Sequence, residues 1–292
     1  MSQATGLMQA DASSQRHARR AGSRAALRAE ASAMRDALAA EWVKLRTLPG
    51  SPWLLLAVVV TTVAVSAAAS AATRCPAGVP CTADPARVCL SGIYLGQAVV
   101  AILGVLIVSG EYSTGMISVT LAALPRRTTV LTAKAVIVTG LTLAAGTVAV
   151  GGSLLAGAMI LPGHGFTSAG GFPDLSLAGG TVLRAAAGSV LYLGLIGLLA
   201  VGAAAAFREA AAAIGTVLGL LYLFPVIAAL AASRIWQRHL QQVGPMTAGL
   251  EIQATRNLHS LVISPWAGLG VLAAWAAGAL IAGGLLLRLR DA

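Results

Sequence analysis

Residues 53–72 read WLLLAVVVTTVAVSAAASAA, an unbroken run without a charged side chain. A helix needs about 20 mainly apolar residues to cross the hydrocarbon core of a bilayer, and this run has that length. Pro49 and Pro52 stand just before it, and proline is tolerated in the first turn of a helix but not in its interior. We therefore expect a membrane-spanning helix that begins close to Pro52 and is separate from the segment before it.

The same pattern recurs along the whole chain. Of the 292 residues, 57% are hydrophobic and only 10% are charged, whereas a soluble domain carries about 25% charged residues. The few charges are clustered, so several other tracts are long enough to span a bilayer. We predict an all-α, polytopic membrane protein whose six transmembrane helices lie at Trp53–Ala72, Ser91–Ser109, Leu131–Leu161, Leu183–Ala206, Ala210–Ala231 and Pro265–Leu287.

The positive charges predict the orientation in the membrane. The net charge is +10, and eight of the 20 Lys and Arg residues precede Trp53. Loops rich in Lys and Arg stay in the cytoplasm. With both termini inside, the cytoplasmic segments carry 14 basic residues and the external segments six, so we expect an N-in, C-in topology. No aromatic platform or zinc-ligand spacing accompanies the basic residues, and a nucleic-acid partner is not expected.

The segment before the first span divides into two parts. Residues 1–22 are polar and basic without an apolar period, which predicts a disordered basic tail. Residues 23–50 are predicted to form a cytoplasmic amphipathic helix at the membrane interface. Its apolar residues recur at helical spacing; they are Leu27, Ala31, Met34, Leu38, Trp42 and Leu45. This helix is either a passive surface anchor or part of a docking surface for a cytoplasmic partner. Residues 51–292 form the six-helix transmembrane domain.

The three cysteines fall in or beside the first external loop. Cys75 and Cys81 stand in a short loop on the oxidising side of the membrane and are expected to form a disulfide; three unlinked thiols are the alternative. Cys89 would then be free or pair between subunits. The loop holds no histidine and only Asp84 as an acidic residue, so we expect no metal site.

The longest external insertion covers residues 233–264. Its apolar residues fall into two groups on either side of Gly244 and Pro245. We expect two short amphipathic helices that rest on the outer rim of the last two spans, with a loosely ordered loop as the alternative.

The second span carries the most concentrated polar signal. Its inner end reads GEYSTG over residues 110–115, and a carboxylate such as Glu111 at the end of a span requires water or a partner. A stripe of small and polar residues runs up the same helix; its members are Tyr94, Gln97, Ala101, Gly104, Val108 and Glu111. The stripe either packs against other helices, aided by Gly92 and Gly96 in a GxxxG spacing, or lines a pathway.

Residues 116–124 follow, an apolar and polar segment too short to span the bilayer, closed by Pro125, Arg126 and Arg127. We expect a short helix at the cytoplasmic face, held between the second and third spans. A helix in that place can transmit the movement of a cytoplasmic partner to both spans.

No catalytic constellation is present in the sequence. A phosphate-binding loop of the type GxxxxGK[ST] does not occur, and Lys44 and Lys134 are the only lysines. The motifs HExxH, CxxC and GxSxG are absent, and the four histidines are scattered without paired ligands. We therefore expect neither an enzyme in its own right nor a protein with its own cofactor.

Several segments together resemble the permease subunits of ABC transporters, in the class of the actinobacterial type-2 exporters. The resemblance rests on AEWVKLRT at residues 40–47, YLGQ at 94–97, GEYSTGMI at 110–117, LAALPRR at 121–127 and SPWAGL at 264–269. It covers the chain from about residue 38 to its end. The cysteines of the first external loop are not part of that family pattern, so their role stays open.

This resemblance implies an exporter embedded in the lipid bilayer of the plasma membrane. Two permease subunits, identical or paralogous, would pair with two separate ATPase subunits, and these bind the ATP and magnesium. The N-terminal amphipathic helix and the region near residues 114–127 would contact the ATPase. The residues expected to dock or couple are Glu41, Trp42, Lys44, Arg46, Glu111, Tyr112, Thr114, Arg126 and Arg127. The substrate does not follow from the resemblance.

Two other classes of function stay open. A non-transporting membrane protein, such as a scaffold or a signalling or immunity partner of an ATPase, would have the same composition. An ion-coupled secondary transporter normally carries ionisable groups near the middle of its spans. Here Glu111 and Glu209 stand at span ends, which disfavours that class. A soluble ATPase encoded beside this chain would favour the exporter.

Overall fold

The computed structural model describes residues 31–46, 50–75, 81, 83–116, 127–166, 179–231 and 233–289. Within these ranges the chain forms helices joined by turns, and no β-strand occurs among them. Six helices are long and apolar enough to cross a membrane. The predicted all-α, polytopic fold is confirmed.

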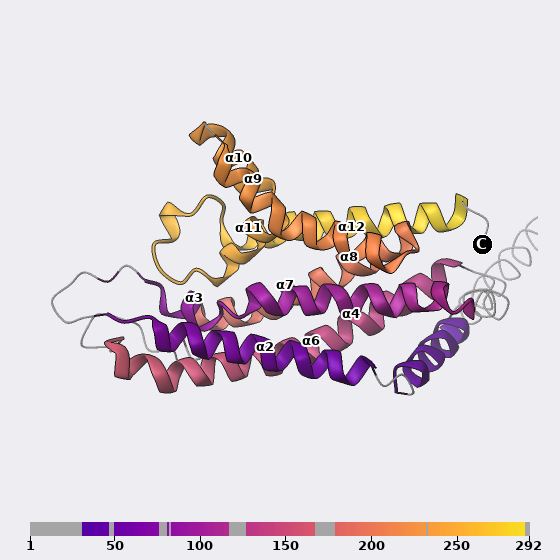
Figure 1. Cartoon of the computed structure of the whole chain (residues 1–292), viewed down its shortest axis with the longest axis horizontal. Helices are drawn as coiled ribbons and strands as arrows, with labels where there is room; N and C mark the ends of the chain where they lie inside the picture. The colour runs from indigo at the N-terminus through magenta and orange to yellow at the C-terminus, as the bar shows by residue number, and fades with distance from the viewer. Residues whose placement is uncertain are drawn as a thin grey trace, which may run out of the picture.

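The six spans agree closely with the predicted ones and lie side by side along the long axis of the molecule (Figure 1). Five of them are single helices: α2 (Gly50–Ala72), α4 (Ile93–Ser113), α6 (Arg127–Ile160), α7 (Gly180–Phe207) and α12 (Pro265–Leu289). The fifth span in chain order has three parts, which are α8 (Ala210–Leu218), the π-helical turn η3 (Gly219–Leu223) and α9 (Phe224–Leu230).

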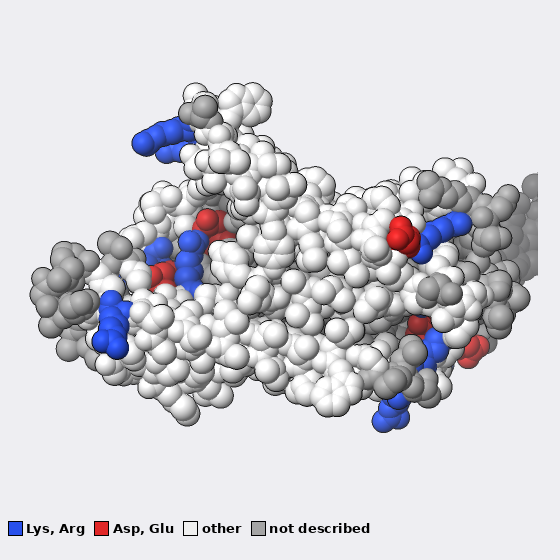
Figure 2. All heavy atoms as spheres, in the orientation of Figure 1, with Lys and Arg blue, Asp and Glu red and all other residues white. Residues whose placement is uncertain are grey.

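Charged side chains gather at the two ends of the bundle, and a broad band without charges separates them on the face shown in Figure 2. The first span explains how such a surface arises. Its buried residues are small and mostly polar; they are Ser51, Val58, Thr62, Ser66 and Ser70. Its exposed residues include Leu56 and Val60. Polar groups face the other helices and apolar groups face outward, as a lipid solvent favours. The chain is therefore a multi-pass membrane protein.

Glycines bring α2 and α4 into close contact. A β-carbon on Gly92 would lie 1.9 Å from the carbonyl oxygen of Thr62, and one on Gly96 would lie 2.1 Å from the Thr62 hydroxyl oxygen. The Gly92 amide donates a hydrogen bond of 3.0 Å to Ser66 Oγ. The GxxxG spacing read from the sequence thus packs α4 against α2, because only small residues let two membrane helices approach so closely.

The central helix of the bundle is α7. It packs against α4, α6, α8 and α12, and none of its residues from 192 to 205 is exposed. Small residues bring its neighbours close. A β-carbon on Gly104 of α4 would lie 2.8 Å from Ala200 Cβ, and one on Gly283 of α12 would lie 2.6 Å from the carbonyl oxygen of Gly202.

The chain reverses after α7 in a very short turn. Arg208 adopts a left-handed conformation with φ of 62°, and α8 then packs back against α7. The fourth and fifth spans are therefore two helices in a tight hairpin. Beyond the π-helical turn and Pro225, α9 and α10 (Arg234–Val243) lean away from the bundle (Figure 1).

The predicted pair of amphipathic helices between residues 233 and 264 is only half right. The first is α10, which ends before Gly244 and packs mainly on α9, the outer part of the fifth span; none of its residues is buried. The second is replaced by α11 (Pro245–Gly249) and two short 3-10 turns, η4 (Leu250–Gln253) and η5 (Leu258–Ser260). In α11 and η4 most residues are buried, so their apolar pattern reflects packing on all sides and not one helical face.

Residues 31–46 form the described part of the N-terminal amphipathic helix, at the same end of the bundle as the C-terminal end of α12 (Figure 1). Its buried line is Ala37, Glu41 and Leu45. Trp42, on the predicted apolar face, is 48% exposed, and the buried residue beside it is the carboxylate Glu41. An ion pair with Lys134 of α6 holds that carboxylate. The predicted tail of residues 1–22 and most of the segment 116–124 lie outside the described residues.

Candidate functional site

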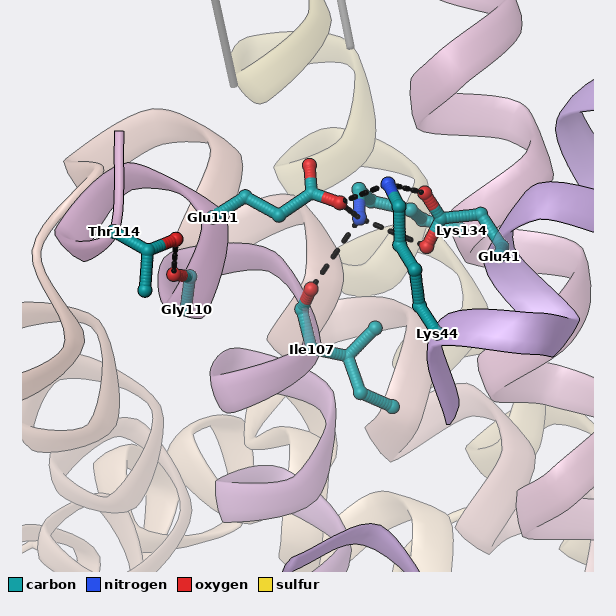
Figure 3. Close-up of polar contacts among 7 residues, drawn as sticks. All are labelled: Glu41, Lys44, Ile107, Gly110, Glu111, Thr114 and Lys134. Atoms are coloured by element: carbon teal, nitrogen blue, oxygen red, sulfur yellow. Dashed lines mark hydrogen bonds and ion pairs between the residues drawn. The ribbon is translucent and has the colours of Figure 1, made fainter. Parts of the chain in front are cut away.

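Four charged side chains from three distant segments meet at the end of the bundle where the N-terminal helix lies. Glu41 and Lys44 belong to that helix, Glu111 to the last turn of α4, and Lys134 to the second turn of α6. Their charged groups point toward one another in Figure 3. We call these four residues the four-charge cluster.

Each lysine of the cluster contacts both carboxylates. Lys44 Nζ lies 2.9 Å from Glu41 Oε1 and 2.6 Å from Glu111 Oε1. Lys134 Nζ lies 3.0 Å from Glu41 Oε2 and 2.9 Å from Glu111 Oε1. It also donates to the carbonyl oxygen of Ile107 at 3.4 Å. The N-terminal helix is thereby joined to α4 and α6 through a closed ring of opposite charges.

The cluster is largely withdrawn from solvent. Glu41, Glu111 and Lys134 are exposed by only 5%, 6% and 3%, whereas the side chain of Lys44 remains 24% exposed. Burying an ion costs several kcal/mol unless close pairing and hydrogen bonds replace its hydration. Two positive and two negative charges in mutual contact meet that condition, and both lysines of the chain are used in it.

The Lys44 ammonium keeps its charge at neutral pH. Burial alone would lower the pKa of Lys44, but hydrogen bonds to Glu111 and Glu41 hold the pKa above its ordinary value of 10.5. Lys44 therefore carries the positive charge that its ion pairs require at neutral pH.

One oxygen of the cluster is left over. Glu111 Oε2 is buried and has no hydrogen-bond partner among the described residues, and in Figure 3 it points away from both lysines. A buried acceptor without a donor costs about 1–3 kcal/mol. This oxygen is the position in the cluster that a further donor can occupy.

The predicted docking residues of the N-terminal helix separate onto two sides. Trp42 and Arg46 are exposed, and the Arg46 guanidinium lies 5.7 Å from the centre of the Trp42 ring. Glu41 is buried on the opposite side, in the cluster. The sequence pattern AEWVKLR therefore gives one exposed side and one buried side.

The predicted residues that follow the second span are not part of the ring of charges. Tyr112 is half-buried, and the Arg208 guanidinium lies 5.7 Å from its ring centre. Thr114 is exposed and its hydroxyl donates to the Gly110 carbonyl oxygen at 2.8 Å. Arg126 and the side chain of Arg127 lie outside the described residues.

Sequence reasoning misses Lys134 as a member of the site. A count of basic residues treats it only as a cytoplasmic charge. Its position inside an otherwise apolar tract is the available signal, because a lysine among apolar residues of a span is normally paired. Arg208 is missed in the same way, since only the fold brings it to Tyr112.

The stripe on α4 lies in contacts between helices from Gln97 to Glu111. Gln97 is fully buried, and its Nε2 donates to Met246 Sδ at 2.9 Å and to the Tyr94 carbonyl oxygen at 3.2 Å. Its Oε1 accepts from the Tyr192 hydroxyl. Tyr94, at the other end of the stripe, is 44% exposed. The buried part of the stripe is therefore engaged in helix packing.

An apolar hollow of about 700 Å³ lies between α7, α8 and α12. Small residues widen it, and larger apolar side chains line the rest; its walls include Gly202, Ala206, Val217, Leu220, Trp275 and Gly278. A ligand in this hollow would be held mainly by apolar contact.

The cysteines lie at the end of the bundle away from the cluster. Cys75 and Cys81 are joined by a disulfide, and Cys89 is a buried free thiol. Burial raises the pKa of Cys89 to about 11, which makes it a poor nucleophile and metal ligand at neutral pH. Within the described ranges, no group of three His, Cys, Asp or Glu residues could hold a metal ion.

No model of a known protein family matches this chain. No curated protein compared with it shows significant sequence similarity. What the chain does has to follow from its residues and their geometry.

Proposed function

We propose that this chain is the membrane-spanning permease subunit of an ABC exporter in the plasma membrane, driven by separate ATPase subunits on the cytoplasmic side. The observation that carries the proposal is the four-charge cluster, which joins the N-terminal helix to α4 and α6. A force applied to that helix from outside the bundle reaches both spans through these ion pairs.

The exposed side of the N-terminal helix offers a docking surface for the ATPase. Trp42 and Val43 are 48% and 59% exposed, and Arg46 lies over the Trp42 ring. Tryptophan and arginine carry a large share of the binding energy in protein interfaces. One side of the helix would thus bind the ATPase while the other side holds the spans.

The placement of the acidic residues supports an ATP-driven mechanism over an ion-coupled one. An ion-coupled transporter keeps ionisable groups near the middle of its spans. Among the described residues no acidic side chain lies there: Glu111 stands in the last turn of α4 and Glu209 directly before α8, while Asp84 and Glu251 lie outside the spans. ATP and magnesium would bind in the ATPase, because this chain has no GxxxxGK[ST] loop. Two copies, or this chain and a paralogue, would together enclose the substrate path.

The proposal predicts that a soluble ATPase is encoded beside this chain, and reconstitution of the chain with that ATPase tests it. We expect the two proteins to copurify, and the chain in proteoliposomes to change the rate of ATP hydrolysis. Trp42→Ala combined with Arg46→Ala should weaken copurification by at least about tenfold, since truncating interface hot spots has effects of that size. Lys134→Met should leave the docking side intact and lose the effect on ATP hydrolysis.

Trp266→Ala is the matched control. It removes a similarly exposed tryptophan (56%) at the start of α12, at the opposite end of the bundle, and should change neither readout. The proposal is overturned if no ATPase copurifies with the wild-type chain, or if the rate of ATP hydrolysis is the same with and without it. Equal losses from Trp266→Ala and from the docking variant would remove the N-terminal helix from the contact.

A further inference from the structure

A second set of polar contacts lies at the end of the bundle opposite the four-charge cluster. There residues 250–256, which include η4, run across α7 and α12. Leu250, Ile252 and Ala254 are exposed by 5%, 0% and 1%. Ile252 fits against Gly188 of α7, where a β-carbon would lie 2.0 Å from Ile252 Cγ1. We call residues 250–256 the strap.

A single carboxylate holds the end of the strap. Asp84 Oδ2 accepts hydrogen bonds from the backbone amides of Thr255 at 2.6 Å and Arg256 at 3.0 Å. Asp84 Oδ1 accepts from the Thr255 hydroxyl at 2.6 Å and from the Ala86 amide at 3.1 Å. The last of these bonds caps α3 (Pro85–Cys89). Hydrogen bonds to an ionised carboxylate are about twice as strong as neutral ones, so Asp84 is a strong attachment point for the strap.

Two arginines add further contacts. Arg87 of α3 forms an ion pair with Glu251, and Arg184 of α7 donates to the Ala254 carbonyl oxygen. The side chains of Arg87 and Glu251 are 41% and 18% exposed, and partly exposed ion pairs contribute little to stability. Asp84 therefore makes the larger part of the polar attachment.

The strap continues directly from α11, which covers a buried polar pair. Met246 of α11 accepts the hydrogen bond from Gln97, and Gly249 packs on the ring of Tyr192, where a β-carbon would lie 2.6 Å from Cε2. At the other end of the strap, Asn257 adopts a left-handed conformation with φ of 52°. Few residues other than glycine adopt this conformation as readily as asparagine, and such positions can absorb the backbone changes of a hinge.

We propose that the strap is the exit gate of the transporter and that Asp84 is the residue that holds it closed. Released from Asp84, the strap and α11 lift from Gln97 and Tyr192, and this opens the path between the two copies at the end opposite the ATPase. The gating role rests on the proposed exporter function. Closure of the strap by Asp84 is a property of this chain alone and is tested without the ATPase.

Asp84→Asn weakens the attachment of the strap. Asparagine has no negative charge and keeps a single oxygen acceptor, so it cannot accept the Ala86 amide on one side and the Thr255 and Arg256 amides on the other at the same time. Ala254→Cys places a thiol where the native side chain is 1% exposed. In nanodiscs, Asp84→Asn should raise the rate at which a membrane-impermeant maleimide labels position 254 by at least about tenfold, which corresponds to 1.4 kcal/mol.

Native cysteines and two further variants serve as controls. Cys89 is fully buried, and a β-carbon on Gly157 of α6 would lie 2.1 Å from its Sγ, so it stays unlabelled unless the bundle unfolds. Thr255→Val, which removes one strap donor and leaves α3 capped, should give a smaller increase at position 254. Asp36→Asn, the same chemical change on an exposed residue of the N-terminal helix, should give none.

Two results would overturn closure by Asp84. One is a thiol at position 254 that stays unlabelled in both Asp84→Asn and Thr255→Val. The other is labelling of Cys89 whenever position 254 is labelled, which would show that the bundle unfolds. Adding the ATPase and ATP to the Ala254→Cys chain then tests the exporter. Suppose that ATPase and ATP do not raise the labelling rate at position 254, while Asp84→Asn still does. The exporter function and the gating role then fail, but closure of the strap by Asp84 stands.

Discussion

Replacing Lys134 with methionine should detach the N-terminal helix from the spans. Methionine keeps the length and the apolar stem of lysine but lacks the ammonium group, which lies 3.0 Å from Glu41 Oε2 and 2.9 Å from Glu111 Oε1. Among the described residues, Lys44 is then the only cation in contact with the two buried carboxylates, and one negative charge lacks a counterpart there. Removing one partner of a buried ion pair costs about 3–5 kcal/mol.

The lower end of that range applies here. Lys44 remains in contact with both carboxylates, and its side chain is 24% exposed, so water can reach one side of the cluster. A loss of about 3 kcal/mol corresponds to roughly a hundredfold change in an equilibrium constant. We therefore expect the population with a detached N-terminal helix to rise by that factor in Lys134→Met.

Hydrogen exchange of the backbone amides of residues 31–46 measures this population, because amides exchange when their segment opens locally. In nanodiscs, Lys134→Met should exchange roughly 100 times faster than wild type over this helix and at the wild-type rate in α7. Adding Glu41→Gln to Lys134→Met restores neutrality and leaves the pair of Lys44 and Glu111 at 2.6 Å. This double variant should recover most of the protection, and Asp36→Asn should lose none.

Unchanged exchange in Lys134→Met would show that the cluster does not hold the helix. A double variant that exchanges as fast as the single one would show that lost packing, and not the unbalanced charge, is the cause.

Three other consequences can be measured. Gly92→Ala should lower the yield of folded protein in size-exclusion chromatography, because its β-carbon would lie 1.9 Å from a carbonyl oxygen of α2; Gly140→Ala, at an open position, should not. Reducing the disulfide between Cys75 and Cys81 should lower the free energy of unfolding by about 2 kcal/mol for a loop of this length, with mass spectrometry used to follow the reduction and chemical denaturation to measure the loss. The pKa of Lys44 in the folded protein is raised above 10.5. The contribution of Lys44 to holding the N-terminal helix against α4 and α6 is therefore fully present below pH 10.5 and is lost as the pH rises through this raised pKa. Spin-label distances between the N-terminal helix and α6 that already change near pH 8 would contradict this.

The sequence predicts the spans well and the contacts between distant segments poorly. Runs such as residues 53–72 identify a span because the thickness of the bilayer sets a minimum apolar length. The carboxylate of Glu111 can be singled out for the same reason, since it must be paired at the end of a span. Its partner Lys134 follows only from the packing of α4 beside α6 and the N-terminal helix.

The burial of Glu41 is missed for a physical reason. Apolar periodicity identifies the face of the N-terminal helix that carries Trp42, but it has no means to predict a buried carboxylate such as Glu41. The attachment of the strap to Asp84 could not be predicted from the sequence either. Asp84 and Thr255 are separated by 171 positions, and neither belongs to a recognisable motif.

The enclosed stretch of α7 between residues 192 and 205 is surrounded by four other helices. In lipid, an outward-facing position tolerates almost any apolar side chain, since one hydrocarbon group is replaced by another. An enclosed position selects for size, because an added methyl group must displace neighbouring side-chain or backbone atoms. Across species, the side-chain volumes in this part of the fourth span should therefore stay nearly constant, while hydrophobicity varies. On the outer face of α2, hydrophobicity should stay nearly constant while the side-chain volumes vary.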